Sequence, residues 1–359
     1  MDFWVLSRFD DVFEGYGDWK TYTSTNGISL SEVGDALSMI QMDPPQQVAL
    51  RNLVSRAFTL RRIAEMEPRI RHLTGELLEA LHDVRECDII ERFAALLPSN
   101  VICTMLGIPV DDHEQLRLLT EQILHRDPGT LTPPATSVDA ATRVIEYFGS
   151  HVATKRKQPE NDLVSALCAA ELEGRLLDDA EILGFCFLLL SGGNETTEKL
   201  IANTLYLLAR HPDQRRQVIE DPSLLPGAIE ESLRLISPTQ YMVRTTTRDV
   251  EKHGCILEKG KKVVLLIGAA NRDDRKYSEP DRFDIRREMD RHLAFGYGTH
   301  FCLGASLARL ESRVALEEIH LRLPAYDIDE SGIEMVHAGN VAGMARLPIR
   351  FTPTPSSRI

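Results

Sequence analysis

The sequence is poor in cysteine, and its few cysteines are not grouped. Only six of the 359 residues are cysteine, and no two of them form a CxxC pair. A disulfide framework or a zinc site needs dense or closely paired cysteines, so neither is expected. Scattered, reduced cysteines are typical of the cytoplasm, and we expect the protein to reside there.

Long hydrophobic runs are also missing. The most apolar stretch, residues 182–190, is far shorter than the ~20 residues that a membrane-spanning helix needs. The sequence therefore predicts no membrane span, and it opens with no signal peptide. Internal repeats and low-complexity segments are absent as well.

An excess of positive charge is missing too. The 41 Lys and Arg residues face 54 Asp and Glu residues, for a net charge of -13. Because phosphate contacts need a positive surface, this balance argues against a nucleic-acid partner. The length and the 43% hydrophobic content are sufficient for a large core, built as one large domain or as two smaller ones.

Helical periodicity dominates what is present. Apolar residues at three-to-four spacing predict helices over residues 46–58, 60–81, 90–106, 138–157, 178–209, 213–219, 226–235 and 305–321. Asp178 is the expected N-cap of the longest helix, which should end at His211-Pro212. Strand patterns are few: residues 4–7, 252–256, 262–267 and 347–351. Residues 126–136 and 271–290 should be loops. The fold is therefore predicted to be mainly α with small β-sheets.

One cysteine has an unusual setting. Cys302 lies in "LAFGYGTHFCLGASLARLE", residues 293–311, among Gly296, Gly298 and Gly304. These glycines permit left-handed backbone that brings N–H groups close to the sulfur, and the following helix points its positive end at it. Both effects stabilise a thiolate, which could be a nucleophile or a metal ligand. Since no Cys/His/Asn signature accompanies it, a ligand of iron is favoured.

Residues 295–304, "FGYGTHFCLG", resemble the haem-binding loop of the cytochrome P-450 family at every signature position. The resemblance extends from "FWVLSRFDDVF" to "MARLPIRF". The stretches "MDPPQQ" and "LSGGNET" are close to the camphor-hydroxylating type, but the substrate-orienting tyrosine of that type is missing near Asp35 and Ala36, so camphor is not the expected substrate. The resemblance implies the cytochrome P-450 fold, with haem b bound by Cys302 between the long central helix and the helix after the cysteine loop. We expect one domain over residues 1–359 that lacks the usual N-terminal helix region.

A second stretch, "LLLSGGNETTEKL", has two adjacent glycines within the predicted long helix. Each costs about 1 kcal/mol relative to alanine, so a close approach or a local distortion is expected there. Helix packing alone is one explanation. The resemblance implies another, an oxygen-binding groove in which Thr196 orients O2 and water and Glu195 relays protons.

The resemblance also implies roles for further residues. Glu231 and Arg234 lie three apart on one helix face and are expected to form a structural network with Arg282. Gln47 stands where many bacterial members carry histidine. The residues expected to contact haem are Gln47, Arg51, Gly192, Arg244, Phe295, Gly296, His300 and Gly304, and those expected to contact substrate are Ser38, Met39, Ile40, Thr239, Gln240 and Val341.

The implied activity is a haem-thiolate monooxygenase that inserts one atom of O2 into a C–H bond or alkene of a small-to-medium apolar molecule, such as a terpenoid or steroid. A separate ferredoxin and reductase would supply the electrons. Three arginines, Arg56, Arg61 and Arg62, either meet an acidic ferredoxin or form an ordinary solvated helix face. Two alternatives stay open: a haem-thiolate peroxygenase that uses H2O2, and a haem protein that binds a ligand without catalysis.

Overall fold

The computed structural model describes residues 2–31 and 38–352, and these residues are mainly helical. The expected mainly α class with small sheets is confirmed. The α-helices are α1 (Phe9–Gly17), α2 (Gln46–Ser55), α3 (Leu60–Glu65), α4 (Glu67–Glu79), α5 (Leu96–Met105), α6 (His113–Leu124), α7 (Ala135–Lys157), α8 (Leu163–Cys168), α9 (Asp179–Gly193), α10 (Glu195–Arg210), α11 (Pro212–Glu220), α12 (Leu225–Leu235), α13 (Ile267–Ala270) and α14 (Ala305–Arg322). Short 3-10 or π turns are η1 (Met39–Gln41), η2 (Ile90–Ala94), η3 (Val110–Asp112), η4 (Pro222–Leu224), η5 (Gly298–His300) and η6 (Glu330–Gly332).

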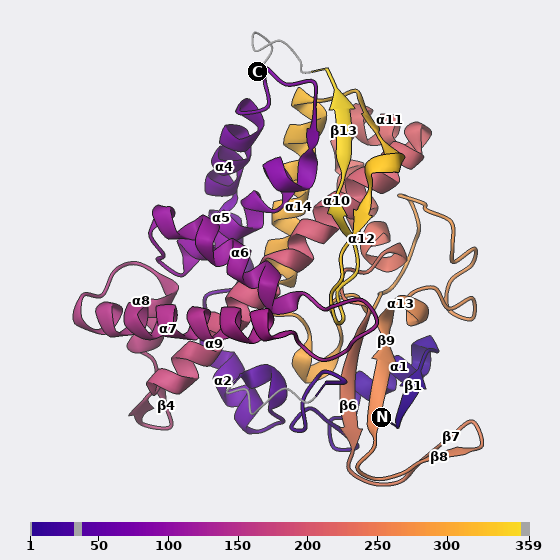
Figure 1. The fold of residues 1–359 in the computed structure, drawn as a ribbon. Helices are drawn as coiled ribbons and strands as arrows, with labels where there is room; N and C mark the ends of the chain where they lie inside the picture. The colour runs from indigo at the N-terminus through magenta and orange to yellow at the C-terminus, as the bar shows by residue number, and fades with distance from the viewer. Residues whose placement is uncertain (1, 32–37, 353–359) are drawn as a thin grey trace.

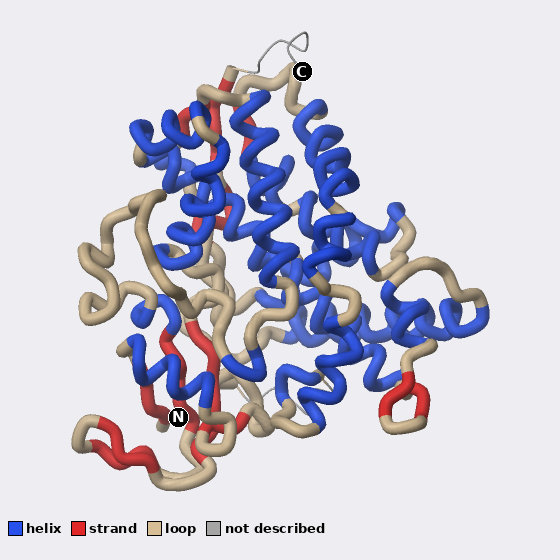
Figure 2. The backbone as a smooth tube through the Cα atoms, turned by 180° about the vertical axis from the view of Figure 1, so that it is seen from behind, coloured by secondary structure: helices blue, strands red, loops and turns tan. Residues whose placement is uncertain are grey.

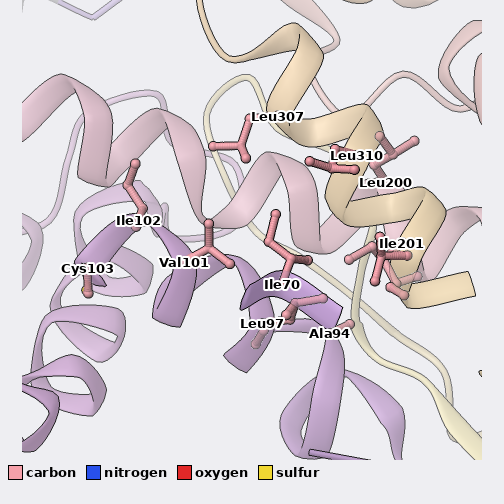
Figure 3. Close-up of a cluster of buried hydrophobic side chains, with 14 of the residues drawn as sticks. Ile70, Ala94, Leu97, Val101, Ile102, Cys103, Leu200, Ile201, Leu307 and Leu310 are labelled. Carbon is pink, nitrogen blue, oxygen red and sulfur yellow. The ribbon is translucent and has the colours of Figure 1, made fainter. Parts of the chain in front are cut away.

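The main apolar core lies where α10 and α14 pack against each other and against α4 and α5 (Figure 1). Figure 3 shows this contact, with Leu310 of α14 beside Leu200 of α10 and with Leu307 further along α14, above Val101. Below them, Ile70, Leu97 and Val101 close the layer. Burial of such side chains contributes roughly 1.5–3 kcal/mol each, so this core fixes α14, and with it the cysteine loop that precedes α14.

The predicted long helix over residues 178–209 is wrong in one respect: it is interrupted. Asp178 is its N-cap as predicted, and it forms a capping box with Glu181. The helix then stops after Gly193, and α10 begins at Glu195. Asn194, at the break, has ψ −75° and makes no side-chain cap bond. Two glycines and an asparagine in sequence weaken the helix at this point.

The strands form small sheets, most of which lie on one side of the helices, while the hairpin of β4 and β5, residues 171–176, lies on the opposite side (Figure 2). The largest sheet has the order β1 (Phe3–Leu6), β9 (Lys262–Leu266), β6 (Tyr241–Thr246), β2 (Tyr22–Thr23), with β1 parallel to β9 and the other pairs antiparallel. A second sheet has the order β10 (Tyr326–Ile328), β13 (Pro348–Phe351), β3 (Glu86–Asp88). The two-stranded pairs are β4 (Glu171–Leu172) with β5 (Arg175–Leu176), β7 (Val250–Lys252) with β8 (Cys255–Leu257), and β11 (Glu334–Met335) with β12 (Met344–Arg346).

Several predicted boundaries are wrong. The expected strand 252–256 contains the turn of a hairpin, because His253 and Gly254 both adopt positive φ between β7 and β8. The expected helix 60–81 is divided into α3 and α4, and the expected helix 90–106 begins as the π turn η2. Helices α1, α6 and α8 and strand β6 were not predicted. These segments are short or irregular in pattern, and tertiary packing decides their structure.

Candidate active site

The loop around Cys302 is held by its own backbone. The N–H of Cys302 donates to the carbonyl of Phe295 at 2.8 Å. Gly296 and Gly298 have φ of 67° and 70°, the left-handed region expected for them. A Cβ at Gly298 would lie 2.9 Å from the carbonyl oxygen of Tyr16, so α1 packs directly on this loop. The loop therefore needs glycine at both positions.

Gly304 differs from its two neighbours, and the expectation of left-handed backbone there is wrong. Its φ is −83°, an ordinary value for any residue. A Cβ built on Gly304 would meet no atom within 4 Å. The requirement at this position is therefore open space next to the sulfur and not backbone freedom.

Cys302 is exposed on the surface of the protein part of this site, although many protein atoms surround its sulfur. Burial raises the pKa of its thiol, and backbone N–H groups of Gly304 and Ala305 and the charges of Arg51 and Arg309 act in the opposite direction. The expected thiolate-stabilising N–H groups are therefore present, but in the protein alone desolvation outweighs them. A metal cation at the sulfur would remove the proton outright.

Two guanidinium groups and an imidazole gather beside this loop. Arg51 donates to the carbonyl of Phe301 at 2.5 Å, and Gln47 donates to that of Thr299 at 2.9 Å. Arg244 is 2% exposed, donates to the carbonyl of Val243, and stacks on the ring of Tyr16. Neither arginine forms an ion pair with a carboxylate among the described residues.

This group of side chains carries net positive charge, because two guanidinium groups, Arg51 and Arg244, face one nearby carboxylate, Asp43. Burial, with the charges of Arg244 and Arg51, lowers the pKa of His300 to about 4, so its imidazole is neutral at pH 7. Burial also lowers the pKa of Arg244, and the charge of Asp43 offsets part of this lowering. Dicarboxylates are the ligands that complement such a site. The expected residues Gln47, Arg51, Arg244 and His300 are thus brought together.

The break between α9 and α10 separates the roles of its two glycines. A Cβ at Gly193 would lie 3.5 Å from Ile102 of α5, so this glycine serves helix packing. Gly192 is exposed and has no atom within 4 Å of a built Cβ, so it faces open space. The Thr196 hydroxyl donates to the Gly192 carbonyl at 2.7 Å.

Glu195 is buried beside this break. Desolvation raises its pKa to about 7. The positive charge of Lys199 acts to lower this pKa, and the negative charges of Glu198 and Glu121 act to raise it further. Its Oε2 has no hydrogen-bond partner, and neither polar atom of the Asn194 side chain has one. A buried carboxyl that is half-protonated near neutral pH is suited to accept and donate protons.

The network around Glu231 exists, but its third member was wrongly predicted. Arg234 binds Glu231 through two nitrogens at 2.7 Å each, with both side chains fully buried. The Arg282 side chain is exposed and pairs with Glu279, and only its backbone carbonyl joins the network, where it accepts hydrogen bonds from Arg234 and Arg287. The second arginine on Glu231 is Arg287, at 3.0 Å. Three arginines lie within residues 282–287, and sequence spacing alone does not distinguish them.

The expected substrate contacts form two groups. Thr239 pairs with Val341 in an isolated bridge, and the N–H of Gln240 donates to the carbonyl of Asn340 at 2.8 Å. The Gln240 side chain folds back to the carbonyl of Ser237. Ser38, Met39 and Ile40 lie at the start of η1, where Met39 is part of the main core, 6% exposed.

Some site residues were not predicted. Glu198 and Lys199 form a buried ion pair, next to Glu195. Glu198 and Lys199 lie three and two residues before the buried Ile201, near the apolar face of α10. This position in the helical pattern is the sequence feature that could have indicated their burial. Ser24, whose hydroxyl lies 3.2 Å from His300 Nε2, gave no sequence signal because the contact joins residues 276 positions apart.

Comparisons with known proteins agree with this geometry. The family model of the cytochrome P450 proteins matches residues 136–330. A relative that carries the name cytochrome P450 123, from Mycobacterium tuberculosis, is 40% identical over 355 residues, which cover 97% of this chain and 88% of the relative. The cytochrome P450 109 of Bacillus spizizenii is 36% identical over 358 residues, covering 98% of this chain and 87% of the relative.

Solved structures agree as well. The structure of CYP109E1 from Bacillus megaterium in complex with testosterone gives a TM-score of 0.90 at 34% identity, covering 97% of this chain and 92% of that one. A mutant of P450 EryK in complex with erythromycin B gives a TM-score of 0.90 at 34% identity, covering 98% of this chain and 91% of that one. The chain therefore belongs to the cytochrome P450 family, whose members bind thiolate-ligated haem b.

The residues of this chain fit that cofactor. The exposed surface of Cys302 offers a sulfur ligand, and a Cβ built on Gly192 or on Gly304 would meet no protein atom within 4 Å, so both positions leave open space. Arg51 and Arg244 lack carboxylate partners among the described residues, as cations that receive haem carboxylates should. No helix in the described part of the chain is both long and apolar enough to cross a membrane.

Proposed function

We propose that the protein is a haem-thiolate monooxygenase that inserts one oxygen atom into a C–H bond or alkene of an apolar molecule. One observation carries this proposal: the buried Glu195 carboxyl, with a pKa of about 7, adjoins Thr196 at a helix break that opens at Gly192. A protein that only binds a ligand has no need of a buried acid. Peroxide-driven relatives have no need of one to deliver protons.

The bound haem would supply the chemistry of O2 activation, for which two protons must reach the site. In our proposal Cys302 ligates the iron, held by the Phe295 carbonyl and by the N–H groups of Gly304 and Ala305. The Thr196 hydroxyl, now bonded to Gly192, orients oxygen and water. Arg51, Arg244, Gln47 and His300 hold the carboxylates, while Phe295 and Gly296 shape the loop.

Protons would reach Glu195 along a row of charged side chains between α10 and α6. Lys199, four residues after Glu195, is 3% exposed and pairs with Glu198. The charge of Glu198 acts on Arg117 of α6. Arg117 in turn forms ion pairs with Glu114 and Glu121 at the surface. The row therefore joins the buried carboxyl to groups in contact with solvent.

The substrate is proposed to be a small-to-medium apolar molecule such as a terpenoid or steroid. The ligands named for two structural relatives, testosterone and erythromycin B, support this class. Ser38, Met39, Ile40, Thr239, Gln240 and Val341 remain the proposed contacts. The buried position of Met39 in the core makes it a wall residue with little surface to offer.

We propose that residues 1–359 act as one domain and receive electrons from a separate ferredoxin and reductase. Arg56, Arg61 and Arg62 are all exposed, which suits a basic docking face. Arg61 also pairs with Glu65, as on an ordinary solvated helix. Six free cysteines are consistent with a cytoplasmic location.

The test has two stages. The dithionite-reduced, CO-bound protein should absorb at the long-wavelength position of thiolate-ligated haem, and a spectrum of histidine-ligated haem would contradict the proposal. A compound library is then screened by the low-to-high-spin shift, and each hit is incubated with NADH, ferredoxin and reductase. Product that needs the electron donors supports the monooxygenase. Product from H2O2 alone would indicate the peroxygenase, and no product from any hit would indicate a ligand-binding protein.

A further inference from the structure

Three side chains next to the cysteine loop form a hydrogen-bonded cluster to which the proposed monooxygenase mechanism assigns no role. Arg309 of α14 binds Glu230 of α12 through two nitrogens, Nε to Oε1 at 2.6 Å and Nη2 to Oε2 at 2.9 Å. His292, whose side chain is 4% exposed, adds a third bond from Nε2 to Oε2 at 3.0 Å. We call His292, Glu230 and Arg309 the Glu230 clamp.

The protonation states of the clamp follow from its hydrogen bonds. The backbone N–H of Ala294 donates to Nδ1 of His292, so Nε2 carries the proton and donates to Glu230. Desolvation acts to raise the pKa of Glu230, but the bonds from Arg309 and His292 lower it to about 2. The Glu230 carboxyl is therefore ionised across the working pH range, and its two bonds from Arg309 hold the guanidinium in one geometry.

The clamp adjoins the cysteine ligand. The Arg309 guanidinium lies 4.6 Å from the ring centroid of Phe295. The carbonyl of that same Phe295 accepts the backbone N–H of Cys302 at 2.8 Å. The charge of Arg309 also acts on the Cys302 sulfur and favours its thiolate form. One guanidinium is thus bound to Glu230 on one side and stacked on the cysteine loop on the other.

We propose that the Glu230 clamp sets the reduction potential of the haem by fixing the charge of Arg309 beside Cys302 and neutralising part of it. Arg309 and Glu230 are positioning residues in this inference, which rests on the proposed haem ligation by Cys302. One-electron reduction of the iron adds negative charge to the site. An unneutralised Arg309 therefore favours reduction, and an unneutralised Glu230 opposes it.

The experiment measures the haem midpoint potential of the ferredoxin-free holoenzyme and of three variants. Glu230→Gln leaves Arg309 unneutralised and should raise the ratio of reduced to oxidised haem at a fixed potential by at least about threefold. Arg309→Met leaves Glu230 unneutralised and should lower that ratio by a similar factor. The double variant should return close to the wild-type value.

The same helix offers matched controls. Arg313, four residues after Arg309, pairs with Glu67 at 2.6 Å and Glu317 at 2.8 Å and makes no ring contact with the cysteine loop. Arg313→Met and Glu67→Gln remove the same charges from a comparable ion pair. Their potentials should stay within the error of the wild type.

The potentials of Glu230→Gln and Arg309→Met should shift in opposite directions if the charges act on the haem. A purely structural role of the clamp would shift the potentials of both variants in the same direction. If Arg309→Met binds no haem, Arg309→Lys keeps the charge and should hold the potential near wild type, while Glu230→Gln still raises it. Shifts of the same sign, or no larger than those of the controls, would overturn the inference. The CO spectrum of the wild type, recorded first, shows separately whether the thiolate ligation fails.

Discussion

At the residue scale, Arg244 is the side chain whose environment is most specific to this site. It is 2% exposed, and it contacts the backbone carbonyl of Val243 and the aromatic face of Tyr16. Burying a guanidinium without a carboxylate is costly, so the residue is explained by an anion that binds there. A haem carboxylate is such an anion.

Replacing Arg244 with methionine tests this explanation. Loss of a charge-assisted hydrogen bond should speed haem release by on the order of 10- to 100-fold, measured as transfer of haem to apomyoglobin. Arg248→Met is the matched control, because Arg248 follows the same strand with a side chain that is 71% exposed. Equal release rates for the two variants would show that Arg244 holds no carboxylate.

Thr196 gives a second residue-scale prediction. Thr196→Ala removes the hydroxyl that bonds the Gly192 carbonyl, but leaves Cys302 and the arginines untouched. Haem binding should persist, while a larger share of NADH is consumed to form H2O2. The ratio of product to NADH measures this share. Unchanged coupling would contradict the role of Thr196 in proton delivery.

Glu195 predicts a pH dependence. Its pKa is raised to about 7, so the carboxyl is protonated below that pH and ionised above it. The coupling of NADH use to product should therefore fall as the pH rises through about 7. Glu195→Gln cannot transfer a proton, so product formation should fall by ~10²-fold and the pH dependence should flatten. A wild-type profile that is flat from pH 6 to 8 would refute this assignment.

At the element scale, the Glu231 carboxylate organises the irregular segment 271–287. Arg234 donates to the carbonyls of Asn271 and Pro280, and Arg287 donates to those of Ser278 and Glu279. A long loop without secondary structure is thereby tied to α12. The cysteine loop follows this segment directly, so the network positions it.

We predict different costs for the two arginines of this segment. Arg287→Met leaves the fully buried Glu231 with one partner fewer and should lower the free energy of unfolding by about 3 kcal/mol. Arg282→Met, at a side chain that is 60% exposed, should change it by less than about 0.5 kcal/mol. Urea unfolding followed by circular dichroism measures both. The reverse order would restore the assignment made from the sequence.

At the scale of the whole molecule, buried neutral groups determine how stability depends on pH. Burial raises the pKa of Glu311 on α14 to about 8, and its Oε2 has no partner. Burial lowers the pKa of His320 to about 4. The raised pKa of Glu311 stabilises the folded state fully below about pH 4.5, and this stabilisation is lost as the pH rises through 8. The lowered pKa of His320 destabilises the folded state only below about pH 6.5.

Between pH 6.5 and 8, therefore, Glu311 acts without opposition from the histidine. The titration of Glu311 should lower the free energy of unfolding by roughly 2 kcal/mol over this interval, and Glu195 adds to the fall up to its own pKa of about 7. Glu311→Gln keeps the shape and removes the titration, so its stability should change less than that of the wild type. Urea unfolding at both pH values measures the difference. Identical slopes for wild type and variant would show that Glu311 does not titrate there.

Several features of this protein follow from the sequence alone. The glycine-rich cysteine loop and the Gly-Gly-Asn-Glu-Thr run can be recognised from the sequence, since the residues that define each of them are consecutive in the chain. The helical periodicity and the capping box at Asp178 are likewise local. Pattern and turn chemistry specify such features before any tertiary contact forms.

The features that join distant parts of the chain depend on tertiary packing. It selected Arg287 over Arg282, because three nearby arginines compete for one carboxylate that lies on another helix. It brought Glu230 to Arg309 and Ser24 to His300, contacts that span 79 and 276 residues. It also buried Glu195 deeply enough to raise its pKa. Burial and long-range pairing are properties of packing, and no local pattern records them.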